Sequence, residues 1–249
     1  GFGAGGGGYG PPGEPPNPYA PPGGDGSGRR PEPGQLEPLE AMSFAWSWIA
    51  QDFAAVALPL AVAGVAITLP ALAVSGATNG LSGAVKVIGS LAGFAVDVVT
   101  QAYVMGGMTR FALAIARGQK PEFGLIFQGS EYFKTFVIGQ ILVTLGTSVG
   151  FAMCVVPGVL LWVGCQFYPY LVVERGLAPM DALRESFRLV EGNWASLIVL
   201  TLLQIAAALV GLAMCCVGAY LLAAPLWCIS GAYAYLKLTG EAPVPTNAA

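Results

Sequence analysis

The clearest candidate for chemistry in this sequence is one acidic residue, Asp97, in the middle of an otherwise apolar run. A charged side chain at the centre of a bilayer costs at least about 3 kcal/mol, so such an acid should face the bundle interior and be protonated or paired. Gln101 follows one helical turn later on the same face, whereas Lys86 shares that face but is too distant for contact. Asp97 is therefore either a proton- or ion-responsive site or part of a structural hydrogen bond between helices.

Single amide side chains stand in three further apolar runs. They are Gln140, Gln166 and Gln204. If these runs cross a membrane, each amide needs a partner on a neighbouring helix, because lipid offers none. We therefore group Gln140 and Gln204 with Asp97 and Gln101 as a candidate intramembrane polar site, although hydrogen bonding between helices is the simpler explanation of the amides.

The residue types that most catalytic and metal sites use are missing or scattered. The chain has no histidine, which is the commonest general base and metal ligand. Its five cysteines all lie in apolar runs without CxxC spacing, where they act as packing residues, with a bridge from Cys154 to Cys215 or Cys216 as the alternative. We therefore expect no enzyme, and we assign no catalytic, cofactor-binding or metal-binding residue.

The composition is typical of a membrane protein. Hydrophobic residues make up 55% of the 249 and charged residues only 10%, and the mean hydropathy is +0.67. Soluble domains carry about 25% charged residues, so much of this surface must face lipid. The net charge is -3 without a dense basic patch, which argues against nucleic acid as a partner. The expected partners are the lipid bilayer and other membrane proteins.

Six apolar stretches each approach the roughly 20 residues that cross a hydrocarbon core. They cover about residues 53–74, 85–108, 136–156, 158–173, 195–215 and 217–236, with Pro157 in the break between the third and the fourth. The sequence thus predicts an all-α fold, a six-helix transmembrane bundle in a domain of residues 36–240. Residues 1–35 form a Gly/Pro-rich tail that cannot bury enough apolar surface to fold, and residues 241–249 form a short C-terminal tail.

Lysine and arginine gather in the connections on one side of these spans. The second-to-third and fourth-to-fifth connections each carry three, whereas the third-to-fourth and fifth-to-sixth carry none. By the positive-inside rule, both termini are cytoplasmic. We therefore expect a protein of the bacterial cytoplasmic (inner) membrane.

Short amphipathic segments precede the first, third and fifth spans. Apolar residues recur at steps of three and four in the first segment (Leu39, Met42, Trp46, Ile49, Phe53) and in the last (Met180, Leu183, Phe187, Val190, Trp194). A weaker copy runs from Pro121 to Phe133, where Glu122 and Gly129 interrupt the apolar face. Such segments are too short and too charged to cross a bilayer, so we predict three helices lying on the cytoplasmic face.

Each amphipathic helix should turn sharply into the following span, near Gln51, Lys134 and Gly192. The chain then consists of three units, each an amphipathic helix followed by a two-span hairpin. If the units are true repeats, the hairpins should superpose about a pseudo-threefold axis along the membrane normal. Independent convergence on amphipathic helices before spans is the alternative explanation.

Two of these connections resemble those of known bacterial membrane proteins. The segments are ARGQKPEFGLIFQG after the second span and YPYLVVERGLAPMDALRESFRLVEGNW after the fourth. They are similar to segments of YciC-like inner-membrane proteins and of the membrane domain attached to some glycerophosphoryl diester phosphodiesterases. In that group a helix of pattern P-x-x-A-L-x-x-S-F/W-x-L follows an E-R/K-G turn; here it is Pro179, Ala182, Leu183, Ser186, Phe187 and Leu189. The resemblance implies a six-helix membrane protein over residues 36–240 and brings no catalytic residues, because this chain shows no phosphodiesterase domain.

Two classes of function fit these observations. The first is a non-enzymatic membrane protein: a scaffold, an assembly factor or a subunit of a larger complex. The second is a small-solute or lipid transporter or flippase that uses Asp97 as an intramembrane acid. A water-filled cavity reaching Asp97 would favour the transporter.

Overall fold

The computed structural model describes residues 36–78, 80, 82–120, 123–127, 129–213 and 219–244. Within these ranges the chain forms helices and no strand, and six helices are long and apolar enough to cross a membrane. The predicted all-α fold with six spans is therefore confirmed. The predicted N-terminal tail, residues 1–35, lies outside the described residues.

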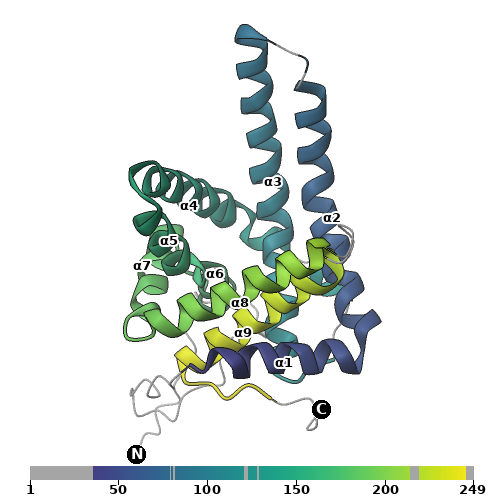
Figure 1. Ribbon diagram of the computed structural model, residues 1–249, viewed down its shortest axis with the longest axis vertical. Helices are drawn as coiled ribbons and strands as arrows, with labels where there is room; N and C mark the ends of the chain where they lie inside the picture. The colour runs from purple at the N-terminus through teal and green to yellow at the C-terminus, as the bar shows by residue number, and fades with distance from the viewer. Residues whose placement is uncertain are drawn as a thin grey trace, which may run out of the picture.

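The first two spans form a hairpin, α2 (Phe53–Thr78) and α3 (Gly83–Ala116), that extends away from the other helices (Figure 1). α2 contains Pro59 and Pro70, which membrane helices tolerate because neighbouring groups satisfy the freed carbonyls. At about 1.5 Å per residue, the 34 residues of α3 are longer than a core of about 30 Å requires. The part of α3 after Val98 is largely buried in the protein, whereas the part nearer the tip is exposed.

The third and fourth spans form a second hairpin. It consists of α4 (Phe133–Met153), α5 (Val155–Cys165) and α6 (Tyr168–Arg175). One extended residue, Cys154, separates α4 from α5. Pro157, which we predicted in this break, lies instead in the first turn of α5, where a helix loses nothing by a missing N–H. A Cβ on Gly150 would come within 2.9 Å of the Cα of Gly158, so these two glycines permit the close approach of α4 and α5.

The last two spans are α8 (Trp194–Ala213) and α9 (Ala224–Thr239), and a π-helical turn, η3 (Ala219–Ala223), leads into α9. Pro225 occupies the first turn of α9, and Gly240 ends the helix with a φ of 84°. That left-handed conformation is easy for glycine and caps the helix C-terminus. α9 lies beside α1 (Pro38–Gln51) at the base of the molecule in Figure 1.

Two of the predicted amphipathic segments are α-helices, α1 and α7 (Pro179–Val190). Only Asp52 separates α1 from α2, and Gly192, with a φ of 89°, turns the chain into α8. The third segment differs from our prediction, because it forms two short 3-10 helices, η1 (Phe123–Phe127) and η2 (Gly129–Tyr132). Gly124 and Gly129 explain the difference, since each glycine costs an α-helix about 1 kcal/mol.

The predicted apolar stripe of α1 is only partly buried against the protein. Ala41, Ala45 and Ile49 are buried, whereas Leu39 and Trp46 of the predicted apolar stripe are exposed. Alanines on the inner face let α1 approach its neighbours closely, and Trp48 and Ile49 are buried beside them, whereas Leu39 and Trp46 point outwards. This outward stripe suits contact with lipid.

The main hydrophobic core lies where the buried part of α3 meets α4, α6 and α9. Leu113, Phe136, Leu171 and Tyr235 are fully buried there in one cluster. Each comes from a different helix, so the core holds the second, third, fourth and sixth spans together. The outer part of the α2–α3 hairpin lies beyond it.

Candidate functional site

Asp97 lies in the outer part of α3 and is half-buried. The Gln101 side chain donates a hydrogen bond from Nε2 to Asp97 Oδ2 at 2.8 Å, so the predicted pair forms within one helix. Gly93, one turn earlier, faces Val74 of α2, which places Asp97 near the side of α3 that faces α2. This hydrogen bond supports the carboxylate locally and joins no second helix.

The two amides form separate contacts between helices. The Tyr168 hydroxyl donates to Gln140 Oε1 at 3.2 Å, which joins α6 to α4. Gln204 Nε2 donates to Ser230 Oγ at 2.9 Å, which joins α8 to α9. The four predicted site residues are thus distributed over three places, and the structure does not bring them together.

Sequence reasoning missed a buried ion cluster of Arg117, Glu174, Tyr235 and Glu241. The Arg117 guanidinium forms ion pairs with Glu174 and, at 3.0 Å, with Glu241. The Tyr235 hydroxyl donates to the other oxygen of Glu174 at 2.6 Å. The Glu174 side chain is only 2% exposed and that of Arg117 17%, so this ion pair is shielded from water.

The charges of the ion cluster stabilise one another. Burial lowers the pKa of the Arg117 guanidinium, but the neighbouring charges of Glu174 and Glu241 outweigh burial and leave this pKa raised. Arg117 therefore stays positive and balances the buried carboxylate. Removing one partner of such a pair leaves an uncompensated buried charge, whose cost is about 3–5 kcal/mol. Loss of any one partner should therefore destabilise the contact between the elements that carry the cluster.

Three helix ends meet at the ion cluster, and each is followed by a glycine in the left-handed conformation. Gly118, Gly176 and Gly240 follow α3, α6 and α9 with φ of 75°, 59° and 84°. The segment after α9 then lies against the end of α3, where the Val244 N–H donates to the Ala116 carbonyl at 3.0 Å. The ends of the second, fourth and sixth spans thus lie together on one side of the protein.

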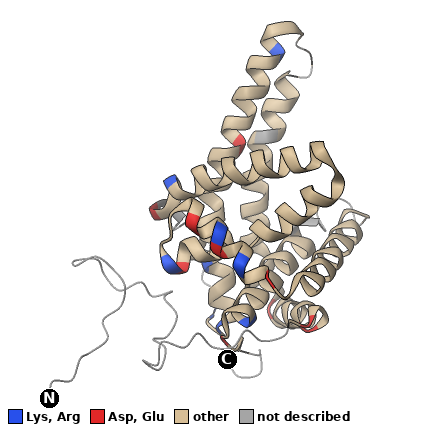
Figure 2. Ribbon diagram, turned by 90° about the vertical axis from the view of Figure 1, so that its left-hand side faces the viewer, with Lys and Arg blue, Asp and Glu red and all other residues tan. Residues whose placement is uncertain are grey.

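Charged residues are concentrated at the end of the molecule opposite the tip of the α2–α3 hairpin (Figure 2). A polar groove of about 740 Å³ lies there between α1 and α9, and Glu241 of the ion cluster is part of its wall. The Tyr233 hydroxyl donates to Glu40 Oε2 at 2.9 Å, and Lys237 Nζ lies 3.7 Å from the same oxygen. These charges in the groove therefore pair with one another.

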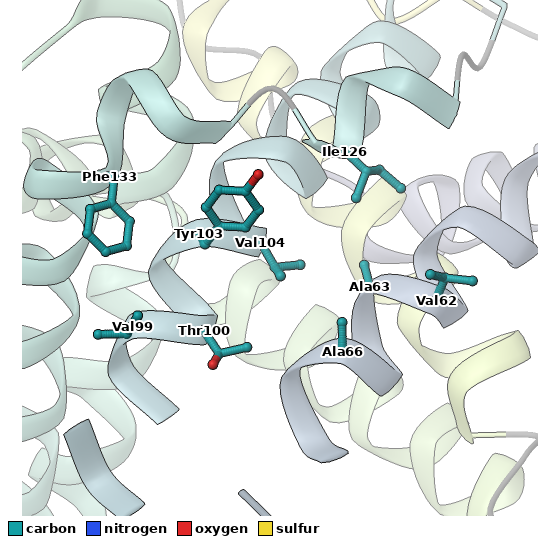
Figure 3. A pocket seen from close by; sticks show the side chains of 9 residues that line it. All are labelled: Val62, Ala63, Ala66, Val99, Thr100, Tyr103, Val104, Ile126 and Phe133. Carbon is teal, nitrogen blue, oxygen red and sulfur yellow. The ribbon is translucent and has the colours of Figure 1, made fainter. Parts of the chain in front are cut away.

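A second, apolar cavity of about 590 Å³ lies between α2, α3, η1 and the start of α4 (Figure 3). It is lined by Val62, Ala63, Ala66, Val99, Thr100, Tyr103, Val104, Ile126 and Phe133. Among the described lining residues, Thr100 and Tyr103 are the two that carry a hydroxyl. Asp97 lines neither the groove nor this cavity.

Metal ligands do not gather in the part of the chain that the structure describes, since no three His, Cys, Asp or Glu side chains come together there. Cys154, Cys165 and Cys228 are free thiols. The alternative bridge from Cys154 involves Cys215 or Cys216, both of which lie outside the described residues.

The relatives found by comparison with known proteins are uncharacterised. No protein-family model and no solved structure matches this chain. Similar curated sequences include an uncharacterised protein of Mycobacterium bovis and two of Mycobacterium tuberculosis. Each is 29% identical over 227 residues, which cover 81% of this chain and 68% of the relative. The structure, with its six helices long and apolar enough to cross a membrane, supports an integral membrane protein, and the relatives assign it no function.

Proposed function

We propose that this protein acts without catalysis as a scaffold, an assembly factor or a subunit of a larger complex in the bacterial cytoplasmic membrane. The observation that carries the proposal is the use of its polar side chains. A catalytic or transport site needs several polar groups that converge on one cavity. Here Gln140, Gln204 and the ion cluster each form hydrogen bonds or ion pairs that join helices to one another.

The outer half of the α2–α3 hairpin offers a surface on which a partner could assemble. Leu72 on α2 and Val87 and Leu91 on α3 are exposed there. The hairpin also carries the half-buried Asp97–Gln101 pair, which is hydrogen-bonded within α3. Membrane helices associate through such packing and polar contacts, so the hairpin is the natural site for a membrane-protein partner.

The location and orientation of the protein belong to the same proposal. The loop charges place both termini in the cytoplasm by the positive-inside rule. The resemblance to YciC-like proteins and to the membrane domain of glycerophosphoryl diester phosphodiesterases supports the inner membrane of a bacterium. It supplies no activity for this chain.

Site-specific photocrosslinking tests the scaffold in living cells. A photoreactive phenylalanine analogue replaces Leu91 on the hairpin and, in a matched control, the similarly exposed Leu145 on α4. We expect a discrete protein adduct from position 91 that is absent or much weaker at position 145. Equal, diffuse labelling at both positions would contradict a hairpin-bound partner.

The alternative function is transport of a small solute or lipid with Asp97 as the coupling acid. Its support is the intramembrane carboxylate itself. Purified protein in vesicles with an internal pH dye would reveal proton movement when a pH gradient or a membrane potential is imposed. Flux that Asp97→Asn abolishes, while the variant melts at the same temperature as the wild type, would replace the scaffold proposal by the transporter.

A further inference from the structure

One wall of the apolar cavity between α2 and α3 is held in place by backbone packing. The backbone of η1 packs directly on α3, since a Cβ on Gly107 would lie 1.8 Å from the Ile126 carbonyl oxygen. Ile126 therefore closes one side of the cavity, and Phe133 at the start of α4 contributes another part of the wall. Figure 3 shows Ala63 and Ala66 of α2 across from Val104 of α3.

The cavity is open on one side, where Val62, Val99 and Tyr103 are exposed, so the medium around the helices can enter its volume of about 590 Å³ and supply an occupant. Water is a poor candidate, since each buried water requires about two to four polar partners. Two of the nine side chains that the structure describes in the lining carry a hydroxyl, and Thr100 already donates its own to the Val96 carbonyl at 2.8 Å. The chemistry of this lining matches an alkyl chain.

The cavity lies where an alkyl chain of a membrane lipid can reach it. Its α2 and α3 walls belong to two helices that are apolar enough to cross a membrane, so the surrounding medium is hydrocarbon. Lys134, which is exposed, directly follows the cavity residue Phe133 at the end of α4 nearest the charged connection. A phosphate at that level would meet a cation while the attached chain lies among apolar side chains.

We propose that the cavity holds one acyl chain of an anionic phospholipid, with its phosphate near Lys134. Under the proposed orientation this lipid comes from the cytoplasmic leaflet. The binding site stands on the cavity and its lining and does not depend on the scaffold function. A lipid held in this way would brace the hairpin against η1 and α4.

Photolabelling of the full chain in vesicles tests this site. The probe is phosphatidylglycerol with a diazirine in one acyl chain, and adducts are mapped by mass spectrometry of peptides. We expect adducts to concentrate on residues 99–104 and on the peptide containing Ile126. Ala66→Phe, which fills the cavity, should remove most of these adducts, whereas Val65→Phe, on the neighbouring exposed position, should leave them unchanged.

The headgroup contact is tested with a second pair of probes. Lys134→Gln should lower labelling by the anionic probe about fivefold and leave labelling by a matched phosphatidylcholine probe unchanged, because one lysine beside a phosphate is lost. Adducts spread evenly over the exposed spans, and insensitive to Ala66→Phe in a variant with unchanged melting temperature, would show ordinary surrounding lipid only. That result would overturn the proposal. Equal loss of both probes in Lys134→Gln would overturn the assignment of the phosphate.

Discussion

At the scale of single residues, the ion cluster is a place where the loss of one side chain should be costly. Arg117→Ala would leave the Glu174 carboxylate buried without its cation, and we expect a loss of about 3–5 kcal/mol in the free energy of unfolding. Thermal unfolding of the purified protein in mild detergent measures this loss. The exposed pair between Arg188 and Glu185 is the control, and Arg188→Ala should cost no more than about 1 kcal/mol because water screens it.

A double variant separates the charge from the packing. Arg117→Met with Glu174→Leu removes both buried charges and keeps apolar bulk, so it should be more stable than Arg117→Ala alone. A double variant that is less stable than Arg117→Ala would contradict this account. It would show that the ion cluster stabilises the fold by more than the mutual neutralisation of its buried charges.

Residue types in the sequence identified polar positions but not their partners. Asp97, Gln140 and Gln204 stand out because each interrupts an apolar run, and the structure gives each a hydrogen bond. Arg117 and Glu174 did not stand out, because both lie at the ends of apolar runs, where charges are ordinary. Their pairing depends on which helix ends meet, and 57 residues of chain separate them.

At the scale of elements, the contact between η1 and α3 depends on one glycine. Gly107→Ala would place a methyl group on the Ile126 carbonyl, so η1 must move away from α3. We expect a loss of about 1–3 kcal/mol and faster proteolysis of the second-to-third connection. Gly146→Ala on α4 is the matched control, because its added Cβ would meet no atom within 4 Å. Equal stability of the two variants would show that this contact is unimportant.

The outward apolar stripe of α1 leads to a prediction about its depth. Trp46 is exposed and Trp48 is buried, although the two are neighbours on the same helix. In variants that keep one tryptophan each, lipids brominated near the headgroup should quench Trp46 strongly and Trp48 weakly, if α1 lies in the interface plane. Quenching of Trp46 by aqueous iodide but not by brominated lipid would show that α1 faces water.

The amphipathic segments show which structural features the spacing of apolar residues can predict. The three-four spacing and the early prolines predicted α1 and α7, because those signals act locally along a helix. The same spacing predicted only part of the face that α1 buries: Ile49 of the stripe is buried, but Ala41 and Ala45, which carry little hydrophobic signal, are buried through close packing against neighbouring helices. In the segment before α4, glycines and the contact with Gly107 override a weak periodic pattern.

At the scale of the whole molecule, the number of spans follows from the sequence, but their arrangement does not. Apolar length alone predicts six crossings, because each helix must satisfy its own backbone in lipid. The separation of the α2–α3 hairpin from the core depends on which side chains interlock, such as Leu113, Phe136 and Leu171. The pseudo-threefold axis stays a prediction, and the weaker third segment argues that any repeats have diverged.

The ion cluster and the loop charges point to the same topology by independent routes. Because Arg117, Glu174 and Tyr235 are in contact, the ends of the second, fourth and sixth spans lie on one side. Under the proposed orientation, which rests on the positive-inside rule, that side is cytoplasmic. Fusions of alkaline phosphatase, which is active only in the periplasm, should therefore be inactive after Gly118, Gly176 and Ala249 and active after Met153 and Ala213. A fluorescent protein that matures only in the cytoplasm should give the reverse pattern and so controls for expression.

Phosphatase activity after Ala249 together with inactivity after Ala213 would contradict the orientation. Activity after only one of Gly118 and Gly176 would contradict the shared side that the ion cluster requires.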